Sequence, residues 1–223
     1  MRIGIIIPDR GDRPEFRRQC GEMLIDQTIN KTNEHKIFFR FIDFKAEDES
    51  CDITKRYRIG YNAFRDSKVD VIALWENDDF YAPDYLETMI NYWISNGKPD
   101  ILGLNHTIYY HIKLFRYYTM NHLTRSSAMN TLIKPDLDFP WCPDHEAFTD
   151  VHLWHTLGKN AVIVKPEKTI CMGIKHGVGL CGGRSHVDRF DRYTNDDSSK
   201  EYLMSVVGKE NFDFYNKYFD SNL

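Results

Sequence analysis

Residues 71–81, VIALWENDDFY, decide the fold that we predict for this chain. The stretch begins as an apolar run and ends abruptly in three acidic residues and an amide, at positions 76–79. An apolar run of this length that stops at polar residues is typical of a buried strand in a parallel sheet. Carboxylates crowded at a strand end repel one another, and a divalent cation with oxygen ligands offsets that repulsion. The alternative is a solvated acidic turn that caps the next helix, since Pro83 and Asp84 follow. We prefer the ligand site, because open α/β sheets bind ligands at strand ends.

Composition limits the possible classes of protein. A chain of 223 residues forms one large α/β domain or two small ones, and its net charge of −4 gives no overall sign of nucleic-acid binding, although a local basic groove is compatible with it. No apolar stretch is long enough to span a membrane, and no signal peptide opens the chain. We therefore expect a cytoplasmic protein. No CxxC pair occurs, so neither a zinc site nor a disulfide framework is expected from the five cysteines, Cys20, Cys51, Cys142, Cys171 and Cys181.

Strands and helices alternate in the first half of the chain. We predict strands at residues 3–7, 37–42, 71–75 and 100–104, with helices at 15–27, 52–64 and about 83–96. This alternation is typical of a parallel sheet with right-handed crossovers. Polar residues follow three of the strands: Pro8 and Arg10 the first, Asp43 the second and residues 76–79 the third. Because parallel strands end at one edge, these residues should line one crevice. No Gly-x-Gly-x-x-Gly follows the first strand, so a dinucleotide fingerprint is absent.

The pattern changes after residue 105. Residues 107–120 predict a long strand or hairpin, and 126–133 a further strand. A helix is expected at 148–157, short strands at 161–164 and 169–173, a glycine-rich loop at 177–183, and a helical tail from 199. We predict a single domain, with a first half at residues 1–105 and a second half at residues 106–223.

Several segments resemble GT-A glycosyltransferases of the family-2 type. Residues 5–8, IIIP, with the arginine-rich turn and Pro-Glu helix after them, resemble the start of that family. Residues 76–86, ENDDFYAPDYL, resemble its DxD segment and following helix. Residues 126–129, SSAM, 149–154, TDVHLW, and 174–177, IKHG, resemble its small-residue strand, its Glu-Asp-x-Asp-Leu helix and its late histidine segment. Each motif is weak alone, but their order and spacing over residues 3–186 make the match fairly specific.

The resemblance implies a fold and a reaction. The fold is a GT-A, Rossmann-like α/β domain, with a mostly parallel central sheet flanked by helices and a smaller antiparallel sheet on the acceptor side. The reaction uses a nucleotide-sugar, usually a UDP-sugar, together with a divalent metal, and inverts the anomeric carbon. By this resemblance, residues 1–105 are the nucleotide-sugar-binding half of the domain and residues 106–223 the acceptor-binding half. The sequence departs from the family where Glu76 begins the DxD triplet, where Thr149 and His152 replace acidic residues, and where residues 45–52 replace a Gly-Ser-Thr-Asp turn.

Metal ligands are expected at the acidic stretch. Asp78 is the first choice, and Glu76 or Asp79 acts directly or through water. By the resemblance, His176 is a further ligand, and its imidazole suits Mn²⁺ better than Mg²⁺. The alternative for His176 is an ordinary hydrogen-bonded loop residue.

Asp150 is the expected general base. It lies in the first turn of its helix, where the helix dipole favours the ionised form that accepts a proton from the acceptor hydroxyl. The alternative is a plain aspartate at a helix start. Trp154 lies one turn further along the same face, where it forms either a wall against the sugar or part of the core.

The remaining predictions concern donor and acceptor. By the resemblance Asp43 accepts the uracil N–H. The other donor-binding candidates are Pro8, Asn77, Arg10, Arg13 and Arg58, with Arg56 competing with Arg58. The acceptor candidates are Ser127, Trp154 and Tyr109, the last in a segment where aromatic and basic residues interleave. Such a segment stacks on sugars or nucleic-acid bases, or forms one buried strand face.

Three functions therefore remain open. The leading one is a metal-dependent glycosyltransferase that acts on a glycan or small molecule. A variant of it glycosylates a modified base in DNA, as phage-type enzymes do. The third is a non-catalytic module that binds nucleotide-sugars. A nucleotidyltransferase would need a glycine- and lysine-rich loop after the first strand, and residues 9–13 do not supply one.

Overall fold

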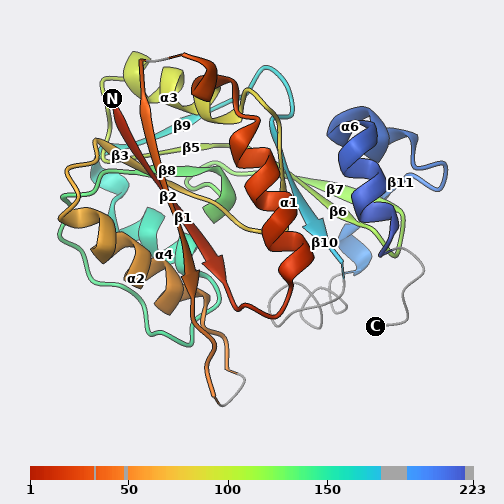
Figure 1. The fold of residues 1–223 in the computed structure, drawn as a ribbon, viewed down its shortest axis with the longest axis horizontal. Coiled ribbons are helices and arrows are strands. Elements are labelled where there is room, and N and C mark those ends of the chain that lie inside the picture. Colours follow the sequence, from red (N-terminus) through yellow and green to blue (C-terminus); the bar gives the residue numbers. More distant parts are fainter. Residues whose placement is uncertain (33, 48–49, 177–189, 219–223) are drawn as a thin grey trace.

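The acidic stretch follows a strand inside a six-stranded sheet (Figure 1). In this computed structural model, which describes residues 1–32, 34–47, 50–176 and 190–218, the strand order is β2 (Lys36–Asp43), β1 (Arg2–Asp9), β3 (Val71–Leu74), β8 (Thr131–Ile133), β5 (Ile101–Leu104) and β9 (Ala161–Val164). β1 pairs in parallel with β2 and β3, and β5 with β9, whereas β8 runs antiparallel between β3 and β5. The predicted mostly parallel central sheet is confirmed.

Helices cover both faces of this sheet, as expected when crossovers connect parallel strands. The helices are α1 (Pro14–Ile25), α2 (Ile53–Arg65), α3 (Tyr85–Ser95), α4 (Thr149–Thr156) and α6 (Glu201–Asn216). One apolar core contains Ile5 of β1 together with buried residues of α1, α3 and α6. The other contains Ile6, the next residue of β1, with residues of α2 and α4. Successive residues of β1 thus enter opposite cores, because strand side chains alternate between faces.

A second sheet begins directly after the acidic stretch. Its order is β11 (Asn195–Asp196), β7 (Arg116–Asn121), β6 (His106–His111), β10 (Cys171–Lys175) and β4 (Phe80–Tyr81). The predicted hairpin is present as β6 and β7, and the sheet is mixed rather than purely antiparallel, because β10 pairs in parallel with β6. β10 returns after the long connection through α4 and β9, and a connection of that length allows parallel pairing. Residues 128–130 form a 3-10 helix rather than a strand.

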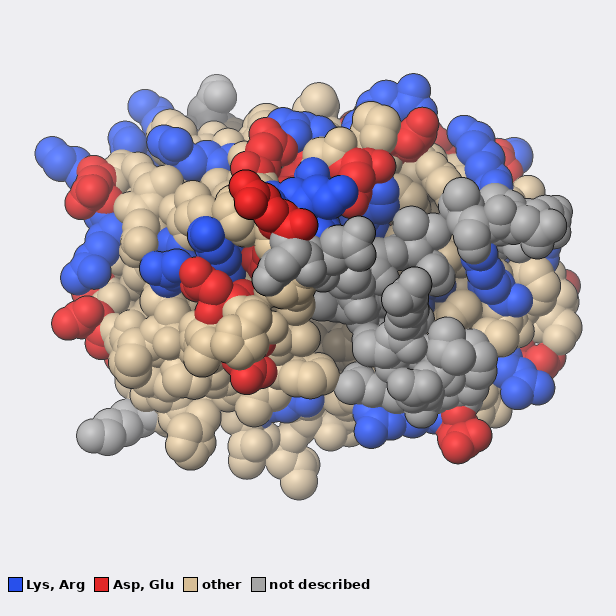
Figure 2. Space-filling view, turned by 90° about the horizontal axis from the view of Figure 1, so that it is seen from below, with Lys and Arg blue, Asp and Glu red and all other residues tan. Residues whose placement is uncertain are grey.

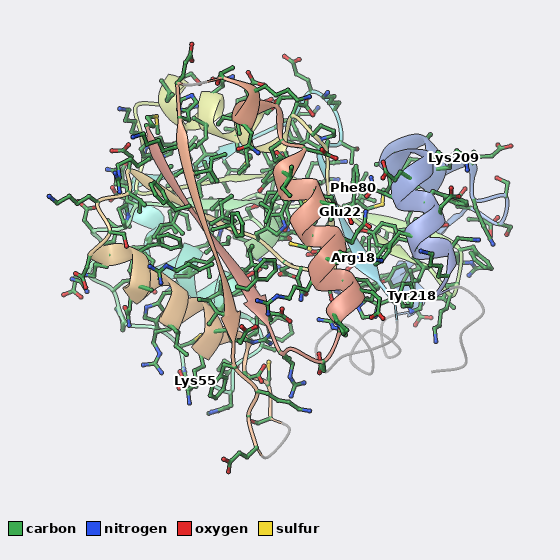
Figure 3. The ribbon with its side chains drawn as sticks, in the orientation of Figure 1. Arg18, Glu22, Lys55, Phe80, Lys209 and Tyr218 are labelled. Atoms are coloured by element: carbon green, nitrogen blue, oxygen red, sulfur yellow. The ribbon has the colours of Figure 1, made fainter. Side chains whose placement is uncertain are left out.

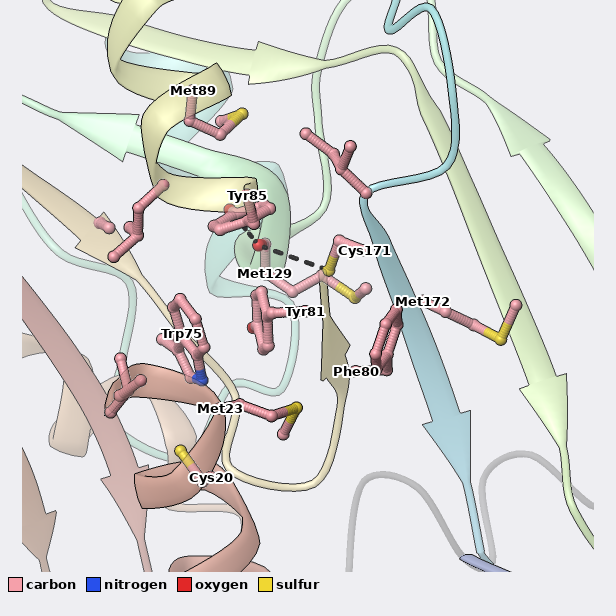
Figure 4. Packing of buried hydrophobic residues seen from close by; sticks show 14 of the residues in the cluster. Cys20, Met23, Trp75, Phe80, Tyr81, Tyr85, Met89, Met129, Cys171 and Met172 are labelled. Atoms are coloured by element: carbon pink, nitrogen blue, oxygen red, sulfur yellow. Dashed lines mark hydrogen bonds between the residues drawn. The ribbon is translucent and has the colours of Figure 1, made fainter. Parts of the chain in front are cut away.

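Aromatic side chains support the backbone of the acidic stretch (Figure 4). The rings of Trp75 and Tyr81 stack with centroids 3.6 Å apart, and the Tyr81 hydroxyl accepts a hydrogen bond from the Glu76 backbone N–H at 2.7 Å. Tyr85 donates its hydroxyl proton to the Met129 carbonyl at 2.7 Å, which ties α3 to the 3-10 helix before β8. The hydroxyls of Tyr81 and Tyr85 therefore both have a partner, and these contacts hold the turn that carries the acids in place.

The tail packs α6 against α1. Gln19 donates a hydrogen bond to Asn211 at 2.7 Å, and the Phe16 ring lies 4.9 Å from that of Tyr218, which Figure 3 labels beside α1. Gly208 kinks α6, since its φ of 75° lies in the left-handed region that glycine tolerates. The predicted glycine-rich loop at 177–183 lies outside the described residues. Within the described ranges, no helix combines the length and apolar character that crossing a bilayer requires.

Candidate functional site

Charged residues gather at the edge of the sheet where β1, β2 and β3 end, which is the edge that Figure 2 faces. The last residues of β1 and β2, Asp9 and Asp43, are neighbours in register. Arg17 of α1 donates a hydrogen bond to Asp9 at 3.0 Å and also pairs with Asp43. Asn77 reaches the other Asp9 oxygen at 3.3 Å. Three strand ends thus meet in one polar network, as the sequence predicts.

Asp78 binds two nitrogen-bearing side chains. Its Oδ2 lies 2.6 Å from Arg13 Nη1 and 3.0 Å from His176 Nε2, and those two nitrogens are 2.8 Å apart. Burial alone would raise the pKa of Asp78, but Arg13 and His176 hold it well below its usual value. Burial lowers the pKa of His176, with its bond to Asp78 opposing the shift. Asp78 is therefore ionised, and the imidazole of His176 beside it is mainly neutral.

Glu76 and Asp79 have a buried lysine as their counter-charge. Asp79 Oδ1 accepts the Ile174 backbone N–H at 2.8 Å and lies 3.9 Å from Lys175 Nζ. Burial raises the pKa of both carboxyls, with Lys175 opposing the shift. Burial lowers the pKa of Lys175, but Asp79, Glu76 and Asp78 raise it further, so the net shift is upward. Lys175 is therefore charged, and it balances carboxylates that would otherwise repel one another.

The three acids fit a divalent cation. Glu76, Asp78 and Asp79 each offer a carboxylate oxygen, and these oxygens all lie within 4.8 Å of one another. Asp79 Oδ2 is buried and receives no hydrogen bond in the described part of the chain. Hard cations bind such oxygens readily. Arg13 holds one oxygen of Asp78, and His176 contacts Asp78 without joining the acidic group, so its predicted role as a ligand is untested.

A cavity of about 380 Å³ brings the acidic stretch and the predicted base together. Glu76 and Lys175 line one part of it, and Asp150 with Arg125 another. Arg125 donates a hydrogen bond to Asp150 at 2.6 Å. Burial raises the pKa of Asp150, and Arg125 opposes that shift. Residues far apart in the sequence thus line one cavity, which is the arrangement that transfer between two substrates requires.

Two predicted acceptor residues line the same cavity. The Tyr109 hydroxyl and Ser127 Oγ are 2.8 Å apart, and His122 Nε2 lies 3.3 Å from the same oxygen. Lys175 Nζ lies 5.3 Å from the centre of the Tyr109 ring. Ser127 and Tyr109 therefore form a hydrogen-bonded wall that leads from the acidic stretch towards Asp150.

Trp154 does not line this cavity, and of its two predicted places, a wall against the sugar and the core, the structure shows the core. Its side chain is 2% exposed in the core formed with α2, and its indole N–H donates to Thr131 at 3.1 Å. Spacing along α4 places Trp154 on the inward face, where a large apolar ring is buried.

The predicted donor arginines are already paired. Arg58 donates to both oxygens of Asp144, at 2.8 and 2.7 Å, and Arg10 Nε lies 3.3 Å from Asp52. Neither pair includes the acids of the 76–79 stretch. Arg13, the remaining candidate, is the arginine that contacts Asp78.

Other donor candidates lie at strand ends. Pro8 is a buried residue of β1 opposite Ile42, whereas Asp43 is 58% exposed on its side chain and open to a ligand. Arg56, the competitor of Arg58, is buried and pairs with Asp52 at 2.7 Å.

Lys175 and Arg125 are the site residues that sequence reasoning did not assign. Lys175 is the polar residue at the end of the apolar strand β10. Glu76 was singled out because it follows an apolar strand, and the same pattern could have identified Lys175. Arg125 lies in a loop, and its contact with Asp150 depends on how two segments far apart in the sequence pack together, which no local sequence pattern predicts.

Comparison with known proteins supports the architecture. No protein-family model matches the sequence, and no curated protein matches it. Among solved structures, S. aureus TarS residues 1–349 superpose with a TM-score of 0.53 at 10% identity, over 79% of this chain and 61% of that one. The same fragment in complex with UDP-GlcNAc gives 0.52 at 10% identity, over 78% and 59%. A longer TarS structure gives 0.51 at 11% identity, over 78% and 37%.

These matches describe the fold. The chain spans less than two thirds of the length of each TarS structure. The shared α/β architecture is of the GT-A type, which confirms the fold class predicted from the sequence, and the chain therefore has a glycosyltransferase-like fold.

Proposed function

We propose that this protein is a metal-dependent glycosyltransferase that moves a sugar from a UDP-sugar to an acceptor hydroxyl with inversion. One observation carries the proposal. The cavity has Glu76, a member of the acidic group, on one wall and Asp150 on another. A diphosphate held at the first wall would direct its sugar towards a base at the second. The TarS complex with UDP-GlcNAc supports a UDP-sugar as the donor.

The leaving group would be stabilised at the acidic stretch. Glu76, Asp78 and Asp79 would hold Mn²⁺ or Mg²⁺, which when bound supplies Lewis-acid stabilisation of the departing diphosphate. Arg13 and Lys175 flank these acids and would add positive charge near the phosphates. His176 would orient Asp78 or join the ligands. Asn77 connects this group to the nucleotide end through Asp9.

Asp150 would be the general base. Its ionised carboxylate takes the proton from the acceptor hydroxyl as that oxygen attacks the anomeric carbon. The new carbon–oxygen bond forms on one face of the sugar, and the bond to the diphosphate breaks on the other with its electron pair leaving on the phosphate. Arg125 would hold Asp150 in place at 2.6 Å until the acceptor arrives.

Donor and acceptor contacts extend the proposal. Asp43 would accept the uracil N–H at the end of β2, while Pro8, Arg10 and Arg58 would shape the nucleotide site through their neighbours. Ser127 and Tyr109 would contact the acceptor, which is a glycan, a small molecule or a nucleic-acid base. The proposal treats residues 1–223 as one domain with a donor half before residue 106 and an acceptor half after it. A cytoplasmic location remains a prediction.

Two alternatives are distinguishable. A non-catalytic module that binds nucleotide-sugars is favoured by the Arg125 ion pair, because the positive charge of Arg125 lowers the pKa of Asp150 and so makes it a weaker base. Action on a modified DNA base has less support, since Tyr109 and Tyr118 stack on each other with ring centroids 5.3 Å apart rather than presenting open faces. Metal-dependent turnover of a UDP-sugar would eliminate the binding module.

The test combines a screen with a variant. Thermal shifts are measured with a panel of nucleotide-sugars, with and without Mn²⁺, and transfer or hydrolysis is then measured with the donor that stabilises the protein. Asp150→Asn keeps the shape of the side chain and should bind donor normally while turnover falls by roughly 10²–10⁴-fold. Asp213→Asn, which changes an exposed ion pair on α6, is the control. Near-normal turnover by Asp150→Asn would overturn the assignment of the base.

A further inference from the structure

β2 is the outer strand of the six-stranded sheet in the part of the chain that the structure describes. In Figure 1 it lies in front of β1, with α1 on one side and α2 on the other. Phe38 is 37% exposed and Phe39 51% exposed, on opposite faces of the strand. An outer strand that presents aromatic residues is a template for pairing with another strand.

The hydrogen bonds of β2 show which of its residues face outward. The N–H groups of Lys36 and Phe44 donate inward to Met1 and Asp9 of the β1 side, at 2.7 and 3.2 Å. Because neighbouring residues of a strand direct their N–H and C=O groups to opposite sides, the odd-numbered residues 37, 39 and 41 direct theirs to the outer side. Each of those three residues can exchange two main-chain hydrogen bonds with the residue opposite it on an antiparallel strand.

We propose that β2 pairs antiparallel with β2 of a second copy of this chain, with the two-fold axis passing at Phe39. Residues that face each other across an antiparallel pair lie on the same side of the sheet. With the axis at Phe39, Ile37 therefore lies opposite Phe41 of the other copy, and Phe38 opposite Arg40. Roughly six main-chain hydrogen bonds form, two at each outward-facing pair.

The side chains of β2 complement themselves in this register. Each Arg40 guanidinium, which lies 5.5 Å from the centre of the Phe64 ring in its own chain, also meets the Phe38 ring of the other copy, a cation–π pair that occurs twice by symmetry. Phe38 already carries one such contact, since the Arg2 guanidinium lies 4.7 Å from its ring centre. Ile37 and Phe41 form two apolar pairs, and the two Phe39 rings meet at the axis. The exposed aromatic residues of β2 are thereby covered.

Arg40 also excludes the neighbouring symmetric register. Moving the axis one residue along, to Arg40, would place the two Arg40 side chains directly opposite each other, and like charges in that position destabilise a sheet. The other neighbouring register, with the axis at Phe38, would place Lys36 opposite Arg40, so like charges face each other there as well. The dimer joins the two six-stranded sheets edge to edge. Because the paired strands are antiparallel, the two carboxyl edges point in opposite directions and both candidate sites stay open.

Oligomeric state tests the proposal. Sedimentation velocity of the full chain across a concentration series should show a reversible dimer. Phe39→Lys brings two lysines together at the axis and should weaken the dimer by at least roughly tenfold. Ile94→Lys is the matched control, because Ile94 is a 44% exposed apolar residue of α3 away from this edge, and it should leave the dimer intact. A monomer at every concentration, or a dimer that Phe39→Lys leaves unchanged, would overturn the proposal.

Disulfide trapping tests the register and does not depend on how Phe39→Lys folds. Under mild oxidation, Phe39→Cys should give a covalent dimer on a non-reducing gel, because residues paired at the axis have Cα atoms about 5.5 Å apart. Arg40→Cys should not, since its two copies would lie about 8 Å apart, beyond the reach of a disulfide. The wild-type chain shows the background from the native cysteines. Trapping by Arg40→Cys instead of Phe39→Cys would place the axis elsewhere and refute this register.

Discussion

Replacing Lys175 with methionine removes the buried positive charge beside the acidic stretch while keeping most of the side-chain volume. In the folded protein, Lys175 Nζ lies 3.9 Å from Asp79 Oδ1. Lys175 lowers the pKa of Asp79 and of Glu76, and these two carboxyls raise the pKa of Lys175. Lys175→Met leaves these carboxyls buried without their main counter-charge, so the variant should be less stable than the wild-type protein.

The magnitude follows from the distance. Two unit charges 3.9 Å apart interact by about 4 kcal/mol at an effective dielectric constant of about 20. That value agrees with the roughly 3–5 kcal/mol lost when one partner of a buried pair is removed. For a chain of this size, 4 kcal/mol corresponds to a fall in Tm of about 8–16 °C.

The loss should depend on pH. Burial raises the folded-state pKa of Glu76 and Asp79 above their ordinary values of 4.5 and 3.8, so the folded protein holds these protons more tightly than the unfolded chain does. Stability from these groups is full below those values and is lost as pH rises through the raised pKa. The positive charge of Lys175 favours the ionised carboxylates and so reduces this loss of stability. The difference in Tm between Lys175→Met and wild type should therefore grow as pH rises and shrink towards pH 4.

Thermal unfolding at several pH values is the assay. Lys209→Met is the control, because Lys209 is 82% exposed on its side chain in an ion pair with Asp213, and its loss should change stability by roughly 0.5 kcal/mol or less. Added Mn²⁺ should restore more stability to Lys175→Met than to wild type, since a bound cation replaces the missing charge. A variant that unfolds with wild-type Tm at neutral pH would refute the electrostatic account of the site.

Two further predictions concern the sheet and the base. Gly103→Ala places a Cβ 2.4 Å from Ser126 Cβ and 2.6 Å from Trp154 Cζ2, and these buried atoms cannot move aside without disturbing the core. The free energy of unfolding, measured by denaturant titration, should therefore fall by about 3 kcal/mol. A loss below about 1 kcal/mol would show that the backbone relaxes. Arg125→Gln removes the charge that lowers the pKa of Asp150, so the acid limb of a pH–rate profile should move to higher pH. An unchanged limb would mean that Asp150 does not control it.

Local patterns in the sequence were sufficient to predict the central sheet. Residues 71–75 are uniformly apolar because β3 is buried on both faces, and Pro14 at the first helical position marks the start of α1. The second sheet was harder to predict. Its β10 pairs with both β6 and the two-residue β4, and such pairing is decided by the packing of distant segments rather than by periodicity. The 3-10 helix at 128–130 lies inside residues 126–133, for which the sequence predicts a single strand, and only residues 131–133 form one.

The residues of the candidate site were likewise predictable only in part. Asp78, Glu76 and Asp150 were recognisable because carboxylates at a strand end and at a helix start are positions where chemistry is common. The partners of these acids were not. Whether Arg13 or Arg10 meets Asp78 depends on the path of the turn between β1 and α1, which carries no periodic signal.

Trp154 shows the limit of reasoning from helical spacing. That spacing places Trp154 on the same face as Asp150, but the Trp154 side chain is buried in the core, where it donates to Thr131, whereas Asp150 lines the cavity. Burial of a large ring is the more common outcome for such a position.

The most direct test of the central claim is a crystal structure with UDP and Mn²⁺, with data collected to show the anomalous signal of manganese. The account predicts an anomalous peak among the carboxylates of Glu76, Asp78 and Asp79, with the diphosphate beside it and Asp150 across the same cavity. Manganese bound at a different place, or UDP bound away from the carboxyl edge of β1 and β3, would contradict it.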